Sequence, residues 1–232
     1  GSDTPEYISP CTALLVQGRI QGGQTWSGSF DINSSCASFA IAYDFAAAKL
    51  AMDPTLKYAV VTGVYNMPSF FVEGDAFAYS IFADGAGSVV LERTEDDNPS
   101  GYITGQQLTD GTQWDYIGIY SGGARKQITH EMLDNKEYGL QLLQPLPGSR
   151  NVELWPPLLD HLLEQVNYSH DDLDHVIFTQ INKSVIEQVM EILKMPMEKT
   201  TTIMDRYGYT GSGCIPMAFH HAVTEGRIKR GD

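Results

Sequence analysis

The chain has 232 residues, 42% of them hydrophobic, which is enough to bury a core in one large domain or two closely packed halves. Its 29 acidic residues outnumber the 15 basic ones and give a net charge of −14, which argues against nucleic acid or an anionic membrane surface as a partner. No apolar run approaches the length of a membrane span and no basic, apolar leader is visible, so we expect a cytoplasmic protein.

The first part of the chain alternates between strand-like and helix-like patterns, which is typical of an α/β layered fold. The patterns predict a helix over 10–19, a helix over 37–52, a buried strand over 58–64 and a strand pair over 77–91 that turns near 84–85. A polar, turn-rich connection follows at 94–101. We place the boundary between two halves there, as residues 1–98 and 99–232.

The second half is predicted to continue the alternation after a long irregular excursion. Its expected elements are a strand over 102–108, the irregular stretch 111–150, a helix over 158–166, a short strand over 176–178, a helix with apolar positions from 184 to 193, and a last helix over 216–225 ended by Gly226.

Cys36 stands where an extended run, residues 29–33, passes through two serines into a helix rich in alanine. A thiol at such an elbow lies near unpaired backbone N–H groups and the positive end of the helix dipole, and both favour the thiolate. The position therefore suits a nucleophile. The alternative is a structural cysteine buried among small helix residues. The other two cysteines, Cys11 and Cys214, show no disulfide or zinc spacing, so we expect reduced thiols, no metal and no bound cofactor.

Three segments carry a resemblance to a known family. The run FDINSSCASF at 30–39 resembles the nucleophile segment of ketoacyl-acyl carrier protein synthase III, in the thiolase superfamily. The run SIFADGAGSVVL at 80–91 resembles the glycine-bearing strand of that family, and 174–182 with 205–212 resemble its carboxy-terminal half. The resemblance implies a thiolase-like α/β fold, layered αβαβα.

The same resemblance implies duplicated halves and a partial chain. A weak internal repeat agrees with duplication, since Ile32-Asn33-Ser34-Ser35 and Ile181-Asn182-Lys183-Ser184 each lead from a strand through a polar turn into a helix. Members of the family carry a strand-helix segment before the region that this chain resembles, and a strand with a glycine-rich loop after it. We therefore expect an internal piece of the enzyme.

The chain departs from the family pattern at two positions that matter for chemistry. The family's catalytic histidine is replaced by Thr179 in FTQIN, and its catalytic asparagine is replaced by Tyr209 in YGYT. In the family these two donors stabilise the enolate formed on malonyl decarboxylation. We expect Thr179 and Tyr209 to lie beside Cys36 in altered roles. Substrate contacts are expected from the neighbouring residues Ile181, Asn182 and Gly208.

The function implied by the resemblance is an acyl-thioester condensing enzyme of fatty acid biosynthesis that forms an acyl-Cys36 intermediate and works as a homodimer. The donor is acyl-coenzyme A or an acyl carrier protein thioester. The stretch 183–194, which matches the family's carrier-protein docking helix, has mixed charge and favours coenzyme A. Two alternatives stay open: an acyltransferase that passes the acyl group to an oxygen or nitrogen nucleophile, and a catalytically weak partner subunit of an active homologue.

Overall fold

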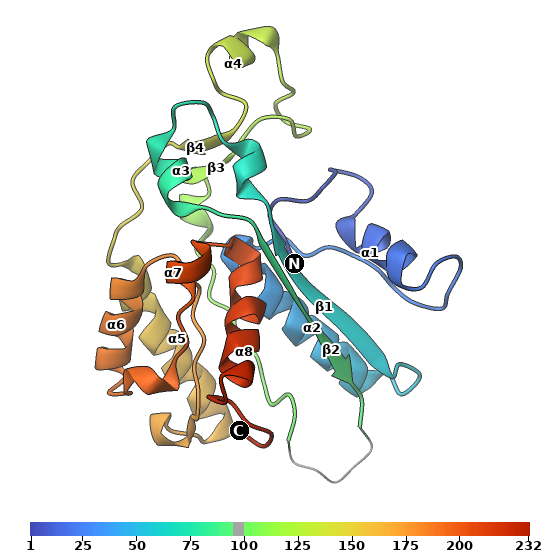
Figure 1. Cartoon of the computed structure of the whole chain (residues 1–232), viewed down its shortest axis with the longest axis vertical. Coiled ribbons are helices and arrows are strands. Elements are labelled where there is room, and N and C mark those ends of the chain that lie inside the picture. The colour runs from blue at the N-terminus through green and yellow to red at the C-terminus, as the bar shows by residue number, and fades with distance from the viewer. Residues whose placement is uncertain (95–99) are drawn as a thin grey trace.

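The computed structural model describes residues 1–94 and 100–232 (Figure 1). The predicted domain boundary between residues 98 and 99 lies outside the described residues. The α-helices are α1 (Thr12–Ile20), α2 (Ser38–Met52), α3 (Ala76–Ile81), α4 (His130–Asp134), α5 (Arg150–Val166), α6 (Lys183–Ile192), α7 (Met204–Tyr207) and α8 (Cys214–Thr224). The strands are β1 (Tyr58–Tyr65), β2 (Gly85–Glu92), β3 (Ile117–Ile119) and β4 (Leu140–Leu142). Two single turns of 3-10 helix matter for the site, η1 (Ser35–Ala37) and η6 (Gly211–Gly213).

The centre of the fold is the antiparallel pair β1–β2, in register from Tyr58 opposite Glu92 to Tyr65 opposite Gly85. Both α2 and α8 pack against this pair and against each other (Figure 1). Gly63 marks the closest approach, because a Cβ added there would overlap the carbonyl oxygen of Ser212 and lie 3.1 Å from the Cβ of Phe39. The alanine-rich sequence of α2 permits this close packing of helix on strand.

The helices α5 and α6 form a second core on the flank of the molecule opposite α1 (Figure 1). The rings of Trp155 and Phe178 stack with their centroids 5.1 Å apart, and Ile186 and Val189 are fully buried. The segment that carries Phe178 pairs with the segment around residue 200 through a parallel bridge between Val176 and Thr200. This core fixes the segment that leads to Thr179.

The first residues run between β1 and the segment that leads to Cys36. The backbone N–H of Ser2 donates to the carbonyl of Ile32 at 3.0 Å, and the N–H of Val64 donates to the carbonyl of Gly1 at 3.1 Å. The N–H of Asn66 donates to Oγ1 of Thr4 at 2.8 Å. Residues 1–4 are thereby bonded to both neighbouring segments.

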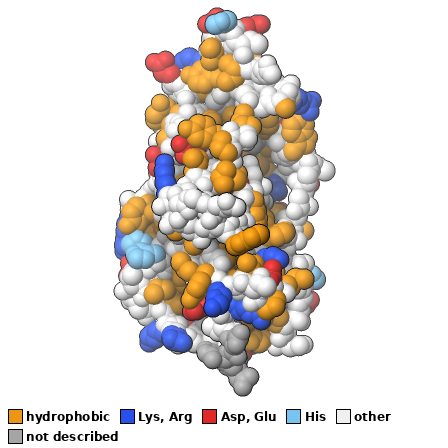
Figure 2. All heavy atoms as spheres, turned by 90° about the vertical axis from the view of Figure 1, so that its right-hand side faces the viewer, with side chains coloured by type: hydrophobic (Ala, Val, Ile, Leu, Met, Phe, Trp, Pro, Cys, Tyr) orange, Lys and Arg blue, Asp and Glu red, His pale blue; other side chains and the backbone are white. Residues whose placement is uncertain are grey.

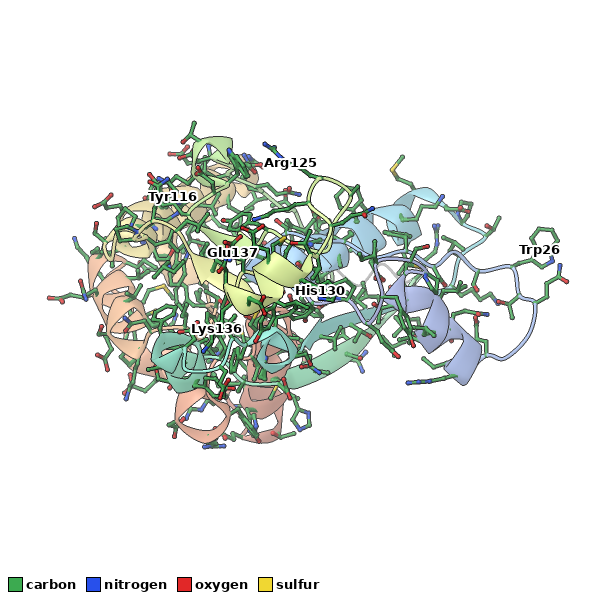
Figure 3. All side chains as sticks on the ribbon, turned by 90° about the horizontal axis from the view of Figure 1, so that it is seen from above. Trp26, Tyr116, Arg125, His130, Lys136 and Glu137 are labelled. Carbon is green, nitrogen blue, oxygen red and sulfur yellow. The ribbon has the colours of Figure 1, made fainter. Side chains whose placement is uncertain are left out.

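The peripheral parts are the excursion that carries β3, β4 and α4, at the top of Figure 1, and the arm that carries α1. In the excursion, Lys126 and Glu137 form an ion pair at 3.0 Å. Trp26 is fully exposed at the tip of the loop that follows α1 (Figure 3). Among the described helices, none combines the length and the apolar character that a bilayer crossing requires.

Several sequence predictions of secondary structure are wrong. The first arm of the predicted strand pair is the helix α3, because the carboxylate of Asp75 accepts hydrogen bonds from the N–H groups of Phe77 and Ala78 and caps a helix. The predicted strand 102–108 has no strand pairing in the structure. The stretch 111–150 is not wholly irregular, since it contains β3, β4 and α4.

The helix expected over 158–166 is also longer than predicted, since α5 begins at Arg150. It runs through Pro156 and Pro157 because Val152, Trp155 and Leu159 recur at helical spacing and pack on the α6 core. The other predicted helices and the strand over 58–64 are confirmed to within two residues at most ends.

Candidate active site

Cys36 occupies the middle of η1, a single turn held in a strained elbow. Ser35, which precedes it, has a φ of 47°, in the left-handed region that side chains other than glycine rarely adopt. The carbonyl oxygen of Ser35 accepts hydrogen bonds from Oγ of Ser38 at 2.6 Å and from Oγ of Ser212 at 3.0 Å. The elbow is therefore fixed by one hydroxyl from α2 and one from η6, far away in the sequence.

A chain of side-chain hydrogen bonds ends at the Cys36 sulfur. Tyr209 Oη donates to Sγ of Cys36. Thr179 Oγ1 donates to Tyr209 Oη at 3.2 Å, and Sγ of Cys214 lies 3.5 Å from Thr179 Oγ1. Because the Thr179 hydroxyl donates its one proton to Tyr209, it accepts in its bond with Cys214, and the Cys214 thiol is the donor. The four groups come from three separate segments of the chain, which meet only in the folded protein.

Tyr209 is held rigidly at the centre of this arrangement. Its side chain is 3% exposed, and its ring lies 6.0 Å from that of Tyr65 and 5.8 Å from that of Phe82, measured between centroids. Its backbone N–H donates to the carbonyl of Ile81 at 3.1 Å, and its carbonyl accepts from Ala83 at 2.9 Å. The phenol is therefore a fixed donor that fills the space beside the thiol.

Comparison with known proteins identifies the family. The family described as 3-oxoacyl-[acyl-carrier-protein (ACP)] synthase III matches residues 30–111, and its C-terminal counterpart matches residues 163–232. These matches cover more than half of the chain. The chain belongs to the 3-oxoacyl-[acyl-carrier-protein] synthase III family. It is accordingly an enzyme of the acyltransferase class.

Individual relatives of the synthase III family agree with this assignment. A beta-ketoacyl-[acyl-carrier-protein] synthase III from Koribacter versatilis (strain Ellin345) is 31% identical over 231 residues, which are 100% of this chain and 68% of the relative. The crystal structure of the synthase III from Aquifex aeolicus VF5 is 27% identical, with a TM-score of 0.82 over 100% of this chain and 68% of that one.

A more distant structural neighbour supports the fold alone. The synthase III, FabH, from Pseudomonas aeruginosa PAO1 is 20% identical, with a TM-score of 0.84 over 100% of this chain and 68% of that one. The predicted thiolase-like α/β fold is confirmed by these neighbours.

The charge state of Cys36 in this synthase III-family chain is opposite to the sequence expectation. Burial raises the pKa of the Cys36 thiol to about 11; the Tyr209 hydrogen bond lowers it by less, and the charge of Asp3 raises it further. The expected thiolate is therefore wrong for the resting site. The physical reason is that α2 begins only at Ser38, after η1, so the helix dipole does not offset the desolvation of the sulfur.

The three predicted substrate-contact residues stand apart from the hydrogen-bonded chain. Asn182 uses its side-chain oxygen to cap α6, where it accepts from the N–H of Ser184 at 3.0 Å. Ile181 is 39% exposed. Gly208, with a φ of 67°, ends α7 just before Tyr209. Their expected role in substrate binding stays a prediction.

Two surface clefts do not include Cys36. One is lined by residues from 169–171 and 193–199, and the other by residues of β2, α7 and α8. The expectation of a tunnel at the Cys36 sulfur therefore stays a prediction as well.

Sequence reasoning did not find three residues that shape this site: Asp3, Tyr65 and Ser212. Their nearness to Cys36 arises from tertiary contacts. Asp3 and Tyr65 carry no local sequence motif, and Ser212 lies in the family segment 205–212 without having been assigned a role there. Cys214 is fully buried, as a core cysteine would be, but its bond to Thr179 also links it to the site.

Proposed function

We propose that this protein takes the acyl group of an acyl-coenzyme A or acyl carrier protein thioester onto Cys36 and transfers it to a carbon acceptor, as a condensing enzyme. The observation that carries the proposal is the O–H of Tyr209 directed at the Cys36 sulfur in a fixed elbow. In the first step Sγ attacks the thioester carbonyl carbon, a new C–S bond forms, and the donor thiol leaves.

The Tyr209 phenol suits a supporting role in this step. Burial raises the pKa of Tyr209 well above its ordinary value, so the phenol remains a donor at neutral pH. Once Sγ is acylated, the same O–H is free to donate to the thioester oxygen. The hydrogen bond from Thr179 polarises the phenol toward donation.

The same phenol bears on the choice between condensation and other acyl transfers. A buried ring beside Cys36 occupies space that a malonyl group would need, and Thr179 lacks the titrating ring of a histidine. An acyltransferase that delivers the acyl group to an oxygen or nitrogen nucleophile avoids an enolate and is the second candidate. A catalytically weak partner subunit is the third.

Charges on α6 favour coenzyme A over a carrier protein as the donor. Lys183 and Glu187, both exposed, lie with Nζ and Oε1 3.9 Å apart, so this lysine is offset by an acidic neighbour. An acidic carrier protein would require an unopposed basic patch to bind at this helix.

We also propose that the protein is a cytoplasmic homodimer of fatty acid biosynthesis, with β1 at the dimer interface. Large hydrophobic side chains are exposed on the first thirty residues, and Figure 2 shows hydrophobic side chains spread over the face on the α1 side. The large hydrophobic side chains exposed on the first thirty residues are Tyr7, Ile8, Leu14, Ile20, Trp26 and Phe30. Burial of such side chains between two copies would favour association.

The first test is acylation of the protein itself. After mixing with a short-chain acyl-coenzyme A, intact-mass measurement should show one added acyl group on the wild type and on Cys11→Ala, and none on Cys36→Ala. Cys11 is a matched control because it is also a half-buried free thiol. Acylation of Cys36→Ala to the wild-type extent would overturn the proposed nucleophile, and an unmodified wild type would favour the partner-subunit alternative.

The second test separates condensation from other acyl transfers. Carbon dioxide release from a malonyl thioester should be slow in the wild type and equally slow in Tyr209→Phe, because neither carries the histidine and asparagine donors of the family. The carbon acceptor of the proposed condensation is therefore one other than a malonyl thioester. Rapid malonyl-dependent condensation by the wild type would show that another group stabilises the enolate, and it would exclude the roles proposed for Thr179 and Tyr209.

A further inference from the structure

Asp3 is a partly buried carboxylic acid with one oxygen bonded by its own backbone N–H and the other left without a hydrogen-bond donor. Its Oδ1 atom is fully buried and has no partner among residues 1–94 and 100–232. An unpaired buried carboxylate costs free energy, because the water that solvated it is not replaced by protein donors. The backbone on both sides of Asp3 is held in place by hydrogen bonds from Ser2 to Ile32 and from Asn66 to Thr4.

The bonds of its neighbours place Asp3 at the nucleophile elbow. Gly1 packs against the start of α2, since a Cβ added to Gly1 would lie 2.5 Å from the carbonyl carbon of Ser38, two residues after Cys36. On the other side, Thr4 is bonded to the N–H of Asn66, which follows Tyr65. Asp3 lies between these two anchors. Its charge raises the pKa of both Cys36 and Tyr65, as expected of a carboxylate near both groups.

The other groups that act on Cys36 cannot accept its proton near neutral pH. Burial raises the pKa of Tyr65, Tyr209 and Cys214, so all three stay protonated. A second carboxylate nearby in the sequence, Asp31, is already used, because its oxygens accept from the N–H groups at the start of α1 at 2.7 and 2.8 Å.

The histidine on the segment before Thr179 is also engaged elsewhere. His175 bonds to Oγ1 of Thr201 at 2.9 Å, and burial lowers its pKa. A thiol that is protonated at rest requires a base before it can attack, and Asp3 is the group left to serve.

We propose that Asp3 is the acid–base residue of the Cys36 site. The proposal rests on the proposed acylation of Cys36. The carboxylate of Asp3 accepts the proton of the Cys36 thiol as Sγ bonds to the acyl carbon of the thioester donor. When the C–S bond to the donor breaks, the departing thiolate takes that proton back from Asp3, so the cycle leaves acyl-Cys36, a free donor thiol and an unchanged carboxylate.

The charges of Asp3 and Cys36 favour transfer of the proton from the thiol to the carboxylate. Burial raises the pKa of Asp3 above that of an ordinary carboxyl, which makes it a stronger base. While Asp3 is ionised, its charge opposes a thiolate at Cys36. When the proton moves to Asp3 that repulsion ends, so one negative charge passes from the carboxylate to the sulfur and no second charge is created.

Replacement of Asp3 by asparagine gives two results of opposite sign. In Asp3→Asn the pKa of Cys36, followed by its rate of alkylation with iodoacetamide against pH, should fall below the wild-type value of about 11, because a repelling charge is gone. More thiolate is then present at pH 7. Acylation of Cys36 by acyl-coenzyme A, followed by intact mass, should nevertheless slow by about 100-fold, the usual contribution of a general base. Asp3→Glu should recover part of the rate. Glu6→Gln, three residues on and exposed, should match the wild type in both measurements.

If Asp3 acted only through its charge, acylation of Cys36 would not slow in Asp3→Asn, because the thiol pKa falls in that variant. Asp3→Asn that acylates at the wild-type rate or faster overturns the proposal. The wild type alone supplies a test that needs no variant to fold: its acylation rate should level off above the pKa of Asp3, whereas a steady tenfold rise per pH unit toward the pKa of the thiol excludes a base. A wild type that is not acylated at all overturns the proposed function and this inference together, while a normal acylation of Asp3→Asn removes this inference only.

Discussion

Tyr209→Phe should slow the alkylation of Cys36 by about ten- to a hundredfold at any pH below the thiol pKa. The phenol donates to the Cys36 sulfur, and a hydrogen bond to a charged group contributes about 1.5–3 kcal/mol, which favours the thiolate by that factor. Loss of the donor raises the pKa of Cys36 further above its value of about 11. The alkylation rate of Cys36 in Tyr209→Phe is therefore lower near neutral pH, and the midpoint of its pH profile moves to higher pH.

The matched control for this variant is Tyr207→Phe. Tyr207 lies two residues earlier and its hydroxyl bonds to Nε2 of His221 at 3.0 Å, on the exposed side of the segment. The Tyr207→Phe variant should leave the pH dependence of Cys36 alkylation unchanged. In the wild type the alkylation rate should climb about tenfold per pH unit through the neutral range, because the thiolate fraction does so below the pKa. A Tyr209→Phe protein with an unchanged or lower midpoint would contradict the account.

Gln180→Ala is expected to reduce the free energy of unfolding by at least about 3 kcal/mol, since several buried backbone groups each lose a partner worth about 1–3 kcal/mol. Gln180 is completely buried. Its Nε2 donates to the carbonyls of Phe178 at 2.9 Å and Thr201 at 3.1 Å, and its Oε1 accepts from the N–H of Ile203 at 2.8 Å. The side chain thus ties together the segments that present Thr179 and Tyr209.

Denaturant unfolding of Gln188→Ala provides the comparison. Gln188 has the same side chain, but it is exposed on α6 and makes one bond, to the carbonyl of Ser184 at 3.1 Å. Its replacement should change stability by no more than about 0.5 kcal/mol. Equal losses for the two variants would show that Gln180 does not join these segments as described.

Much of the fold could be predicted from the sequence because its signals are local. The alanine-rich run after Cys36 and the apolar run at 58–64 gave α2 and β1, and the ordered motifs gave the family. The strand predicted before residue 84 is wrong, because Asp75 was not recognised from the sequence as the residue that caps a helix there. The repeat that suggested duplicated halves aligns the start of α2 with the start of α6, but it gave no indication that α8 is a helix that packs against α2.

The site was predicted less completely, because its chemistry depends on contacts between distant segments. The family motifs predicted Thr179 and Tyr209 beside Cys36; in the structure Tyr209 bonds to the Cys36 sulfur and Thr179 bonds to Tyr209, while their catalytic roles stay predictions. The direction of the Cys36 pKa shift was missed, since desolvation comes from side chains that only the folded chain brings together. The nearness of Asp3 was missed for the same reason.

Peptide mapping of the acylated wild type tests the central claim most directly. After brief reaction with acyl-coenzyme A, digestion and mass spectrometry should locate the acyl group on the peptide that contains Cys36. The informative competitor is Cys214, a second thiol linked to the same hydrogen-bonded chain through Thr179 and completely buried. The account predicts acyl-Cys36 with Cys214 unmodified; an acyl group on Cys214, or on neither cysteine, would contradict it.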